Sequence, residues 1–348
     1  DFVPPQRDDI KITKDETPTG DDATEQSKKI IEPEQDDSDK SDEEKEKLMA
    51  AKMEELNKQK LLEKGRQQEP PKEAKVELIA NNPSEADAEE TKMPESILMP
   101  SQYFDTVDMK TFMMSPAPKN YLIQCSIKRE KTTFGFFSKY YLMHGSRILM
   151  AGKKQAGNRT STYAIAIDPK GVSSKSKTYL GRVRSNFIGT EFNIWDHGLK
   201  HTKAKTPDQL RQQLGVVVYE QNFLGSKGPR KMHVRLPEVT NGEINVIKPT
   251  SKKDGMLDMK TGFKEYYNKP PRWSEQYSAF VLNFNGRVEM PSVKNFQLVH
   301  ESNEDYIVLQ FGRVNKDTFT MDFQWPISPF QAFAICLSSF DYKLACEQ

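Results

Sequence analysis

The chain is poor in cysteine, and it contains no hydrophobic run long enough to cross a membrane. Its three cysteines are Cys125, Cys336 and Cys346, too few and too widely spaced for a disulfide framework. We therefore expect reduced, core-filling thiols in a cytosolic or nuclear environment. No early apolar segment is typical of a secretory signal. Because the first residue is Asp1, the sequence is consistent with a fragment of a longer protein.

Aromatic residues are almost absent from the first quarter of the chain. Residues 1–95 contain only Phe2, and they hold 28 acidic against 16 basic side chains. Residues 96–348 hold 22 against 35, so net charges of −12 and +13 nearly cancel. A segment this acidic and this poor in apolar residues cannot bury enough apolar surface to offset the conformational entropy that folding would cost. We predict a disordered acidic arm over 1–95, a linker over 96–111 and one folded domain over 112–348.

Catalytic motifs are absent as well. No cysteine is followed by arginine at the offset of a phosphatase loop, and neither Gly-x-Ser-x-Gly nor His-Glu-x-x-His occurs. Residues Gly225 to Lys231 resemble a phosphate loop but lack its Lys-Ser/Thr ending, so we expect a structural turn. His197 and His201 flank Gly198 in a predicted loop, a poor arrangement for a metal. The sequence predicts a non-enzymatic protein without metal or cofactor.

Runs of β-branched and aromatic residues recur every ten to fifteen residues in the second part of the chain, separated by Gly, Pro, Asn and Asp. Twelve such runs predict a mainly β fold. The predicted strands are Tyr121 to Ile127, Tyr140 to His144, Thr162 to Ile167, Tyr179 to Arg184, Phe187 to Trp195, Gly215 to Tyr219, Met232 to Leu236, Ile244 to Ile247, Ala279 to Phe284, Asn295 to Val299, Tyr306 to Phe311 and Phe319 to Phe323.

The last segment predicts a helix that is apolar on every side. Ser328, Pro329 and Gln331 provide a cap, a proline at the first helical position and a capping-box partner. Ala332 to Leu337 follow without a polar residue, and the pattern continues to Ala345. Such a helix must be buried all round, yet it is too short for a membrane span. We predict a closed antiparallel barrel of about twelve strands around this helix.

Two long motifs stand out in the folded part, Gly286 to Gln297 (GRVEMPSVKNFQ) and Ala332 to Glu347 (AFAICLSSFDYKLACE). These stretches resemble the two most diagnostic stretches of the tubby-like family. The resemblance covers roughly residues 112–348 and implies a barrel of twelve strands around a central C-terminal helix. Departures at Glu289, Pro291 and Tyr342 suggest a divergent member. Supporting matches are Arg184 to Gly189, Asn222 to Met232 and Tyr306 to Val314.

Two arginines stand two residues apart in the run Thr178 to Asn186 (TYLGRVRSN). Strand geometry places Leu180, Arg182 and Arg184 on one face and Val183 on the other. The two arginines would stand about 7 Å apart along the strand. Guanidinium groups bind phosphate with two hydrogen bonds each, so this pair could hold neighbouring phosphates of one inositol ring. An ordinary solvated barrel face is the alternative.

The resemblance favours the ligand site over the solvated face. It implies a basic pocket for phosphatidylinositol 4,5-bisphosphate in a cytosolic leaflet, with Arg182 and Arg184 as its cationic pair. Arg211 matches a further arginine of the pocket. At a fourth position, where the family has Asn, this chain has Thr162, which keeps a hydroxyl donor but lacks the amide.

Other basic residues could support membrane attachment. Lys153, Lys154 and Arg159 are predicted in a loop beside the pocket, where each cation near an anionic leaflet adds about 1 kcal/mol. A solvated loop is the alternative.

The acidic arm contains one helix-forming run. An N-cap at Ser41, an acidic first turn and good helix formers predict a short helix over 42–68. Leu56 to Pro70 is similar to the short helix through which animal tubby-like proteins bind intraflagellar transport complex A. Residues 41–70 are therefore a candidate partner-binding segment, and a transient solvated helix is the alternative. The candidate contact residues are Leu56, Leu61 and Leu62.

Two functions follow from these patterns and the resemblance. The first is an adaptor, peripheral at the plasma or ciliary membrane, which binds the lipid and links membrane-protein cargo to intraflagellar transport into cilia. The second is a transcription regulator that leaves the membrane and binds DNA in the nucleus. Because the only strong helix of the domain is predicted to be buried, no recognition helix is available, which favours the adaptor.

Overall fold

The computed structural model describes residues 96–131, 138–156, 160–220, 231–251, 253–274 and 279–341. The acidic arm over 1–95, with its predicted helix and the candidate contacts Leu56, Leu61 and Leu62, lies outside these residues. Arg159 and Cys346 lie outside them as well.

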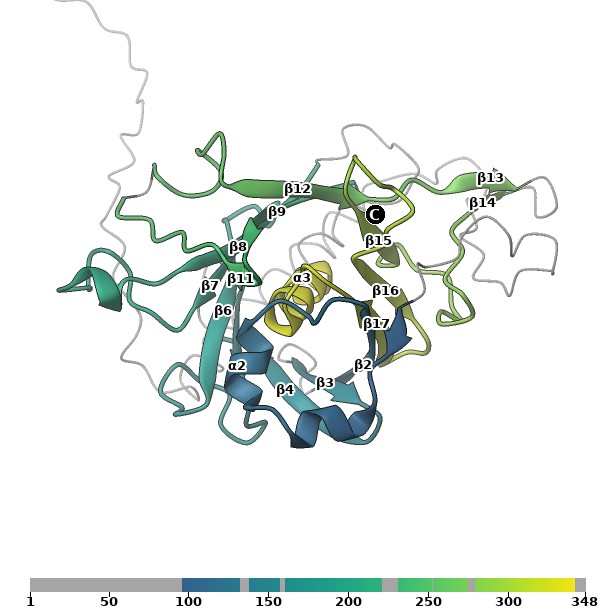
Figure 1. Ribbon diagram of the computed structural model, residues 1–348, viewed down its shortest axis with the longest axis horizontal. Helices are drawn as coiled ribbons and strands as arrows, with labels where there is room; N and C mark the ends of the chain where they lie inside the picture. The colour runs from purple at the N-terminus through teal and green to yellow at the C-terminus, as the bar shows by residue number, and fades with distance from the viewer. Residues whose placement is uncertain are drawn as a thin grey trace, which may run out of the picture. The chain divides into compact units, whose positions relative to one another are not determined.

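Within the described residues, twelve strands close into one antiparallel barrel, which confirms the predicted fold (Figure 1). The barrel strands are β2 (Tyr121–Lys131), β3 (Ser138–His144), β4 (Arg147–Lys154), β5 (Thr162–Ala166), β6 (Tyr179–Ser185), β7 (Glu191–Asp196), β8 (Gln213–Tyr219), β9 (Met232–Pro237), β12 (Phe263–Asn268), β15 (Phe296–Val299), β16 (Leu309–Arg313) and β17 (Thr318–Phe323). Their order is β2-β17-β16-β15-β12-β9-β8-β7-β6-β5-β4-β3, and β2 pairs with β3 to complete the ring. Closure leaves no edge strand in the ring.

Further elements surround the ring. Two short hairpins, β10 with β11 and β13 with β14, form separate two-stranded sheets. The predicted linker, residues 96–111, contains β1, which pairs in parallel with β2, and Phe104, which lies in the hydrophobic core. These elements are β1 (Ile97–Leu98), η2 (Ser101–Asp105), α2 (Met109–Met114), η3 (Pro207–Gln209), β10 (Val239–Thr240), β11 (Glu243–Ile244), β13 (Arg272–Ser274) and β14 (Ala279–Val281).

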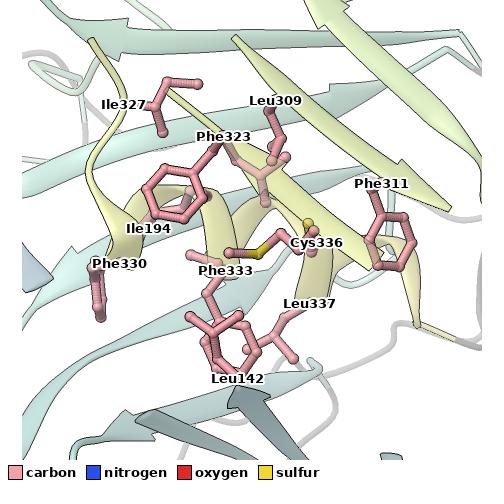
Figure 2. Packing of buried hydrophobic residues seen from close by; sticks show 14 of the residues in the cluster. Leu142, Ile194, Leu309, Phe311, Phe323, Ile327, Phe330, Phe333, Cys336 and Leu337 are labelled. Atoms are coloured by element: carbon pink, nitrogen blue, oxygen red, sulfur yellow. The ribbon is translucent and has the colours of Figure 1, made fainter. Parts of the chain in front are cut away.

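The helix α3 (Pro329–Ser339) lies inside the ring of strands, as predicted (Figure 1). Every residue of α3 is buried. Figure 2 shows Phe330, Phe333 and Leu337 of the helix among apolar side chains from the surrounding strands. An apolar helix and the inward faces of the strands therefore form one core, which satisfies the requirement that a helix without a polar face be covered on all sides.

The polar groups of α3 are paired inside the barrel. The predicted capping box is present, because the Ser328 side chain accepts a hydrogen bond from the Gln331 N–H and the Gln331 side chain accepts one from the Ser328 N–H. The Gln331 amide also donates to the Leu214 carbonyl of β8 at 2.8 Å. At the other end, the Ser338 hydroxyl bonds the Tyr219 hydroxyl at 2.8 Å. Hydrogen bonds thus fix α3 to the strands at both ends.

Two of the twelve predicted strands do not belong to the barrel. The run Ile244 to Ile247 contributes only to the β10–β11 hairpin, and Ala279 to Phe284 contributes to the β13–β14 hairpin. In the first run, Ile244 packs against the main core, and Ile247 belongs to a small cluster with Val216 of β8. Apolar runs alone therefore do not distinguish ring strands from the segments that cover them.

Two ring strands, β4 and β12, were not predicted. β4 contains Gly152, which breaks the apolar run of its sequence. A Cβ at Gly152 would stand 2.9 Å from Leu337 Cδ1 of α3, so the glycine permits close helix packing. β12 (FKEYYN) is mostly polar or exposed, because only Tyr266 is buried there. Pairing with the neighbouring strands therefore determines both β4 and β12 more than their own residue composition does.

Two of the three cysteines are buried free thiols, as predicted. Cys125 lies on β2 and Cys336 on α3. Burial raises the pKa of both thiols well above the ordinary value, so both stay protonated and pack as small apolar groups.

The buried position of α3 generates a stability prediction. Ala334→Asp should prevent folding or lower the free energy of unfolding by about 3 kcal/mol or more, because an unpaired charge would lie in the fully buried core. Lys260→Asp, on the exposed surface, is the matched control. Thermal unfolding followed by circular dichroism measures both. Equal melting temperatures for the two variants would show that α3 is not the core of the barrel.

Candidate functional site

Arg182 and Arg184 lie together on the outer face of β6. The strand register places Arg184 opposite Thr162 of β5, and Arg182 opposite Ala164 of β5 and Trp195 of β7. Arg184 is exposed and Arg182 is half-buried, while Val183 between them lies in the barrel core. The shared face that the sequence predicts for the two arginines is confirmed.

Leu180 does not share that face, contrary to the prediction. Its side chain lies in the same core cluster as Val183. The register shifts between Ile165 and Ala166, which pair with Gly181 and Tyr179, so Leu180 is an extra residue without a partner on β5. Such a bulge reverses the alternation of side chains. Tyr179 consequently joins the outer face beside the arginines.

Arg211 completes a cluster of three arginines, although it lies 27 residues from Arg184 and precedes β8. Its guanidinium carbon lies 3.7 Å from the centroid of the Trp195 ring, close enough for a cation–π interaction. Its backbone N–H donates to the Leu199 carbonyl at 2.8 Å. The long β7–β8 connection thus brings Arg211 over Trp195 of β7, which is the neighbour of Arg182 on β6.

Close backbone packing holds Arg211 in place. A Cβ at Gly198 would stand 2.5 Å from the Arg211 Cα, so only glycine fits there. The Asp196 carboxylate accepts hydrogen bonds from the Gly198 N–H at 2.9 Å and the Gln212 N–H at 2.8 Å. One carboxylate therefore ties together both ends of the β7–β8 connection and fixes the direction of Arg211.

The three arginines repel one another. Burial, together with the positive charges of Arg182 and Arg184, lowers the pKa of Arg211 to about 10, although Asp196 and Tyr179 oppose this shift. Arg211 remains a cation at neutral pH. The fold therefore maintains three like charges within mutual electrostatic range, which is a cost unless an anion compensates it.

The cluster has little compensation from the described part of the protein. The Arg182 Nε is buried and has no hydrogen-bond partner among the described residues. The Arg184 Nε donates to the Thr160 hydroxyl at 3.1 Å, a neutral partner. None of the three guanidinium groups forms an ion pair within the described ranges. A buried donor without a partner is uncommon in proteins and indicates a missing acceptor.

Thr162 lies beside this cluster as the first residue of β5. It is 8% exposed, and Arg184 is its neighbour across the strands. Its hydroxyl can donate one hydrogen bond and can also accept hydrogen bonds.

The predicted loop of supporting lysines is a strand. Lys153 and Lys154 end β4, and because neighbouring strand residues point to opposite faces, they separate. Lys153 pairs with Ala164, in the same row as Arg182. Lys154 instead points inward, where its Nζ lies 3.6 Å from the buried Asp341 carboxylate. Lys154 therefore supports the core and not a membrane contact.

Trp195 is the site residue that the sequence did not reveal. Its sequence context, EFNIWD, is typical of a strand, and nothing local indicates that a cation from a later loop covers the ring. The signal could have come from Gly198, since a glycine beside a strand end often marks a close backbone approach.

The Tub family model matches residues 113–342. This chain belongs to the Tub family. Tubby-related protein 2 of Mus musculus is 44% identical over 254 residues, which cover 68% of this chain and 45% of the relative. Tubby-related protein 3 of Mus musculus is 41% identical over 264 residues (71% and 57%), and tubby-related protein 1 of Homo sapiens is 40% identical over 261 residues (71% and 48%). The matched region spans about half the length of these relatives.

The described ranges contain no group of three or more His, Cys, Asp or Glu side chains placed to hold a metal. No described helix is both long and apolar enough to cross a bilayer.

The Arg182 Nε, which has no partner in the described part of the chain, allows a prediction about stability. Arg182→Met should leave the melting temperature unchanged or raise it at low ionic strength, because it removes an unsatisfied buried donor and a repulsive charge. Arg129→Met is the matched control. Arg129 pairs with Asp317 at 2.9 Å and donates to the Lys316 carbonyl, so its loss should cost about 1 kcal/mol or more. Equal destabilisation of both variants would show that Arg182 is not an unsatisfied and repelled cation in the folded protein.

Proposed function

We propose that this Tub-family protein binds phosphatidylinositol 4,5-bisphosphate through Arg182, Arg184 and Arg211. The three-arginine cluster on the outer barrel face contains a buried Nε that has no acceptor among the residues the structure describes. An anion with several oxygen atoms would satisfy that donor and offset the repulsion among the cations. We propose a binding role for the cluster, since its described side chains include no nucleophile hydrogen-bonded to a base.

The geometry suits two neighbouring phosphates better than one. Arg182 and Arg184 follow the same face of β6, about 7 Å apart along the strand, and Arg211 approaches from the β7 side. Each guanidinium can donate two parallel hydrogen bonds to one phosphate. In this arrangement the pair on β6 binds the two ring phosphates, Arg211 closes the opposite side and the Thr162 hydroxyl adds a neutral donor.

We further propose an adaptor role. The lipid would hold the barrel at the cytosolic leaflet of the plasma or ciliary membrane, while residues 41–70 recruit intraflagellar transport complex A and link membrane-protein cargo to cilia. A DNA-binding regulator in the nucleus is the alternative. In the barrel itself the core helix α3 is buried, which disfavours major-groove recognition by that helix.

Removal of the strand pair tests the site. Arg182→Ala/Arg184→Ala should lower the affinity for vesicles containing phosphatidylinositol 4,5-bisphosphate by two or more orders of magnitude, since charged hydrogen bonds contribute about 1.5 to 3 kcal/mol each. The charge-matched control is Lys128→Ala/Lys316→Ala, two exposed residues at least four strands from β6. Sedimentation with vesicles at low and moderate salt measures binding, beside a titration with duplex DNA.

Three outcomes separate the alternatives. A large loss in the strand pair alone, persisting at moderate salt, supports a pocket. Equal losses in both variants that disappear as salt screens the charges would reveal only a basic surface. Tight binding to duplex DNA without lipid binding would favour the nuclear alternative.

The arm is tested separately. Deleting residues 41–70, or replacing Leu56, Leu61 and Leu62 together by Ala, should abolish recovery of the intraflagellar transport complex in pull-downs from ciliated cells. The apolar face of the predicted helix would be lost in both variants. Vesicle binding by the barrel should be unchanged. If both variants recover the complex as the parent does, the arm is not the binding segment.

A further inference from the structure

The turn between β6 and β7 exposes two neighbouring apolar side chains. Phe187 is 68% exposed and Ile188 is 60% exposed. Large apolar groups gain free energy when they leave water, and an exposed pair at the tip of a hairpin is well placed to do so. The turn is also close to the arginine cluster, which suggests a common partner.

Hydrogen bonds of the Asn186 side chain organise the backbone of this turn. The Asn186 side-chain oxygen accepts hydrogen bonds from the N–H groups of Gly189 at 2.7 Å and Thr190 at 3.0 Å. The Asn186 amide donates to the Thr190 hydroxyl at 3.0 Å. Gly189 has a φ of 89°, which glycine adopts without strain. Asn186 therefore builds a rigid turn that presents Phe187 and Ile188 at its tip.

The cations and the apolar tip follow one another along the chain. Arg184 precedes Phe187 by three residues, and β6 ends between them at Ser185. The Thr160 hydroxyl, which accepts from the Arg184 Nε at 3.1 Å, belongs to the β4–β5 connection at the same end of the barrel. The apolar tip thus projects beyond the cationic groups proposed to bind phosphate. In a leaflet, the acyl chains likewise lie deeper than the phosphates of the headgroups.

We propose that Phe187 and Ile188 insert into the boundary between headgroups and acyl chains of an anionic bilayer. The inference rests on the proposed function, because the arginines supply the headgroup contact that brings the turn to the membrane. Amphipathic elements penetrate this boundary by about 5 to 10 Å, which a short hairpin tip can reach. A freely soluble inositol phosphate would contact the arginines alone. The apolar tip should therefore strengthen binding to the lipid in a membrane and not binding to the soluble headgroup.

A polar tip tests the insertion. Phe187→Ser/Ile188→Ser leaves Asn186 and Gly189 in place and should preserve the turn. Binding of soluble inositol 1,4,5-trisphosphate, measured by calorimetry, should stay within about twofold of the parent. Affinity for phosphatidylcholine vesicles containing phosphatidylinositol 4,5-bisphosphate should fall by about ten- to a hundredfold, since two apolar side chains no longer leave water.

The matched control removes a similar apolar pair elsewhere. Ile97 and Leu98 of β1 are 63% and 56% exposed. They pair with the first residues of β2. The β6–β7 turn lies at the other end of the barrel, where β2 ends. Ile97→Ser/Leu98→Ser should bind both the soluble headgroup and the vesicles as the parent does.

A direct readout of depth accompanies the affinities. Phe187→Trp should add tryptophan emission that brominated acyl chains quench in vesicles containing phosphatidylinositol 4,5-bisphosphate, over the signal of the parent. Vesicle affinity of the serine variant equal to that of the parent, or absence of added quenching, would overturn the insertion. Equal loss of soluble headgroup and vesicles would overturn it too, since the turn would then support the pocket only. Failure of the parent to bind either ligand would overturn the lipid site itself.

Discussion

The structure depends on an apolar helix being buried within a ring of strands. α3 has no polar face, and each of its residues is buried. The strands must therefore close around it, and their inward side chains must match its surface, down to Gly152, where a Cβ would approach Leu337 to 2.9 Å. The hydrophobic effect supplies most of the driving force, while Gln331 and Ser338 tie the helix ends to β8.

This core makes the outer face available for function. On each strand alternate residues point outward, so Val183 contributes to the core while Arg182 and Arg184 face out. The closed barrel is stable enough to carry three arginines that repel one another. Burial of Arg211 and the charges of Arg182 and Arg184 together lower the pKa of Arg211. Sites that bind anions commonly carry such uncompensated charge before the ligand arrives.

The sequence predicted those features that depend on local residue order. The cap at Ser328 and the apolar run behind it indicated α3, and period two placed Arg182 beside Arg184. The bulge at Leu180 was missed because it depends on the register with β5. β12 was missed because its polar residues become a strand only between β9 and β15. Trp195 was missed because the cation that covers it comes from a distant turn of the chain.

In the proposed lipid complex, the Arg182 Nε donates a hydrogen bond to a phosphate of the headgroup. Nuclear magnetic resonance of arginine side chains labelled with nitrogen-15, with inositol 1,4,5-trisphosphate added to the full chain, tests this contact. The Nε–H signals of Arg182, Arg184 and Arg211 should shift together at saturation, while the Arg129 signal stays fixed. Unchanged signals from all three arginines, at headgroup concentrations that saturate binding, would contradict it.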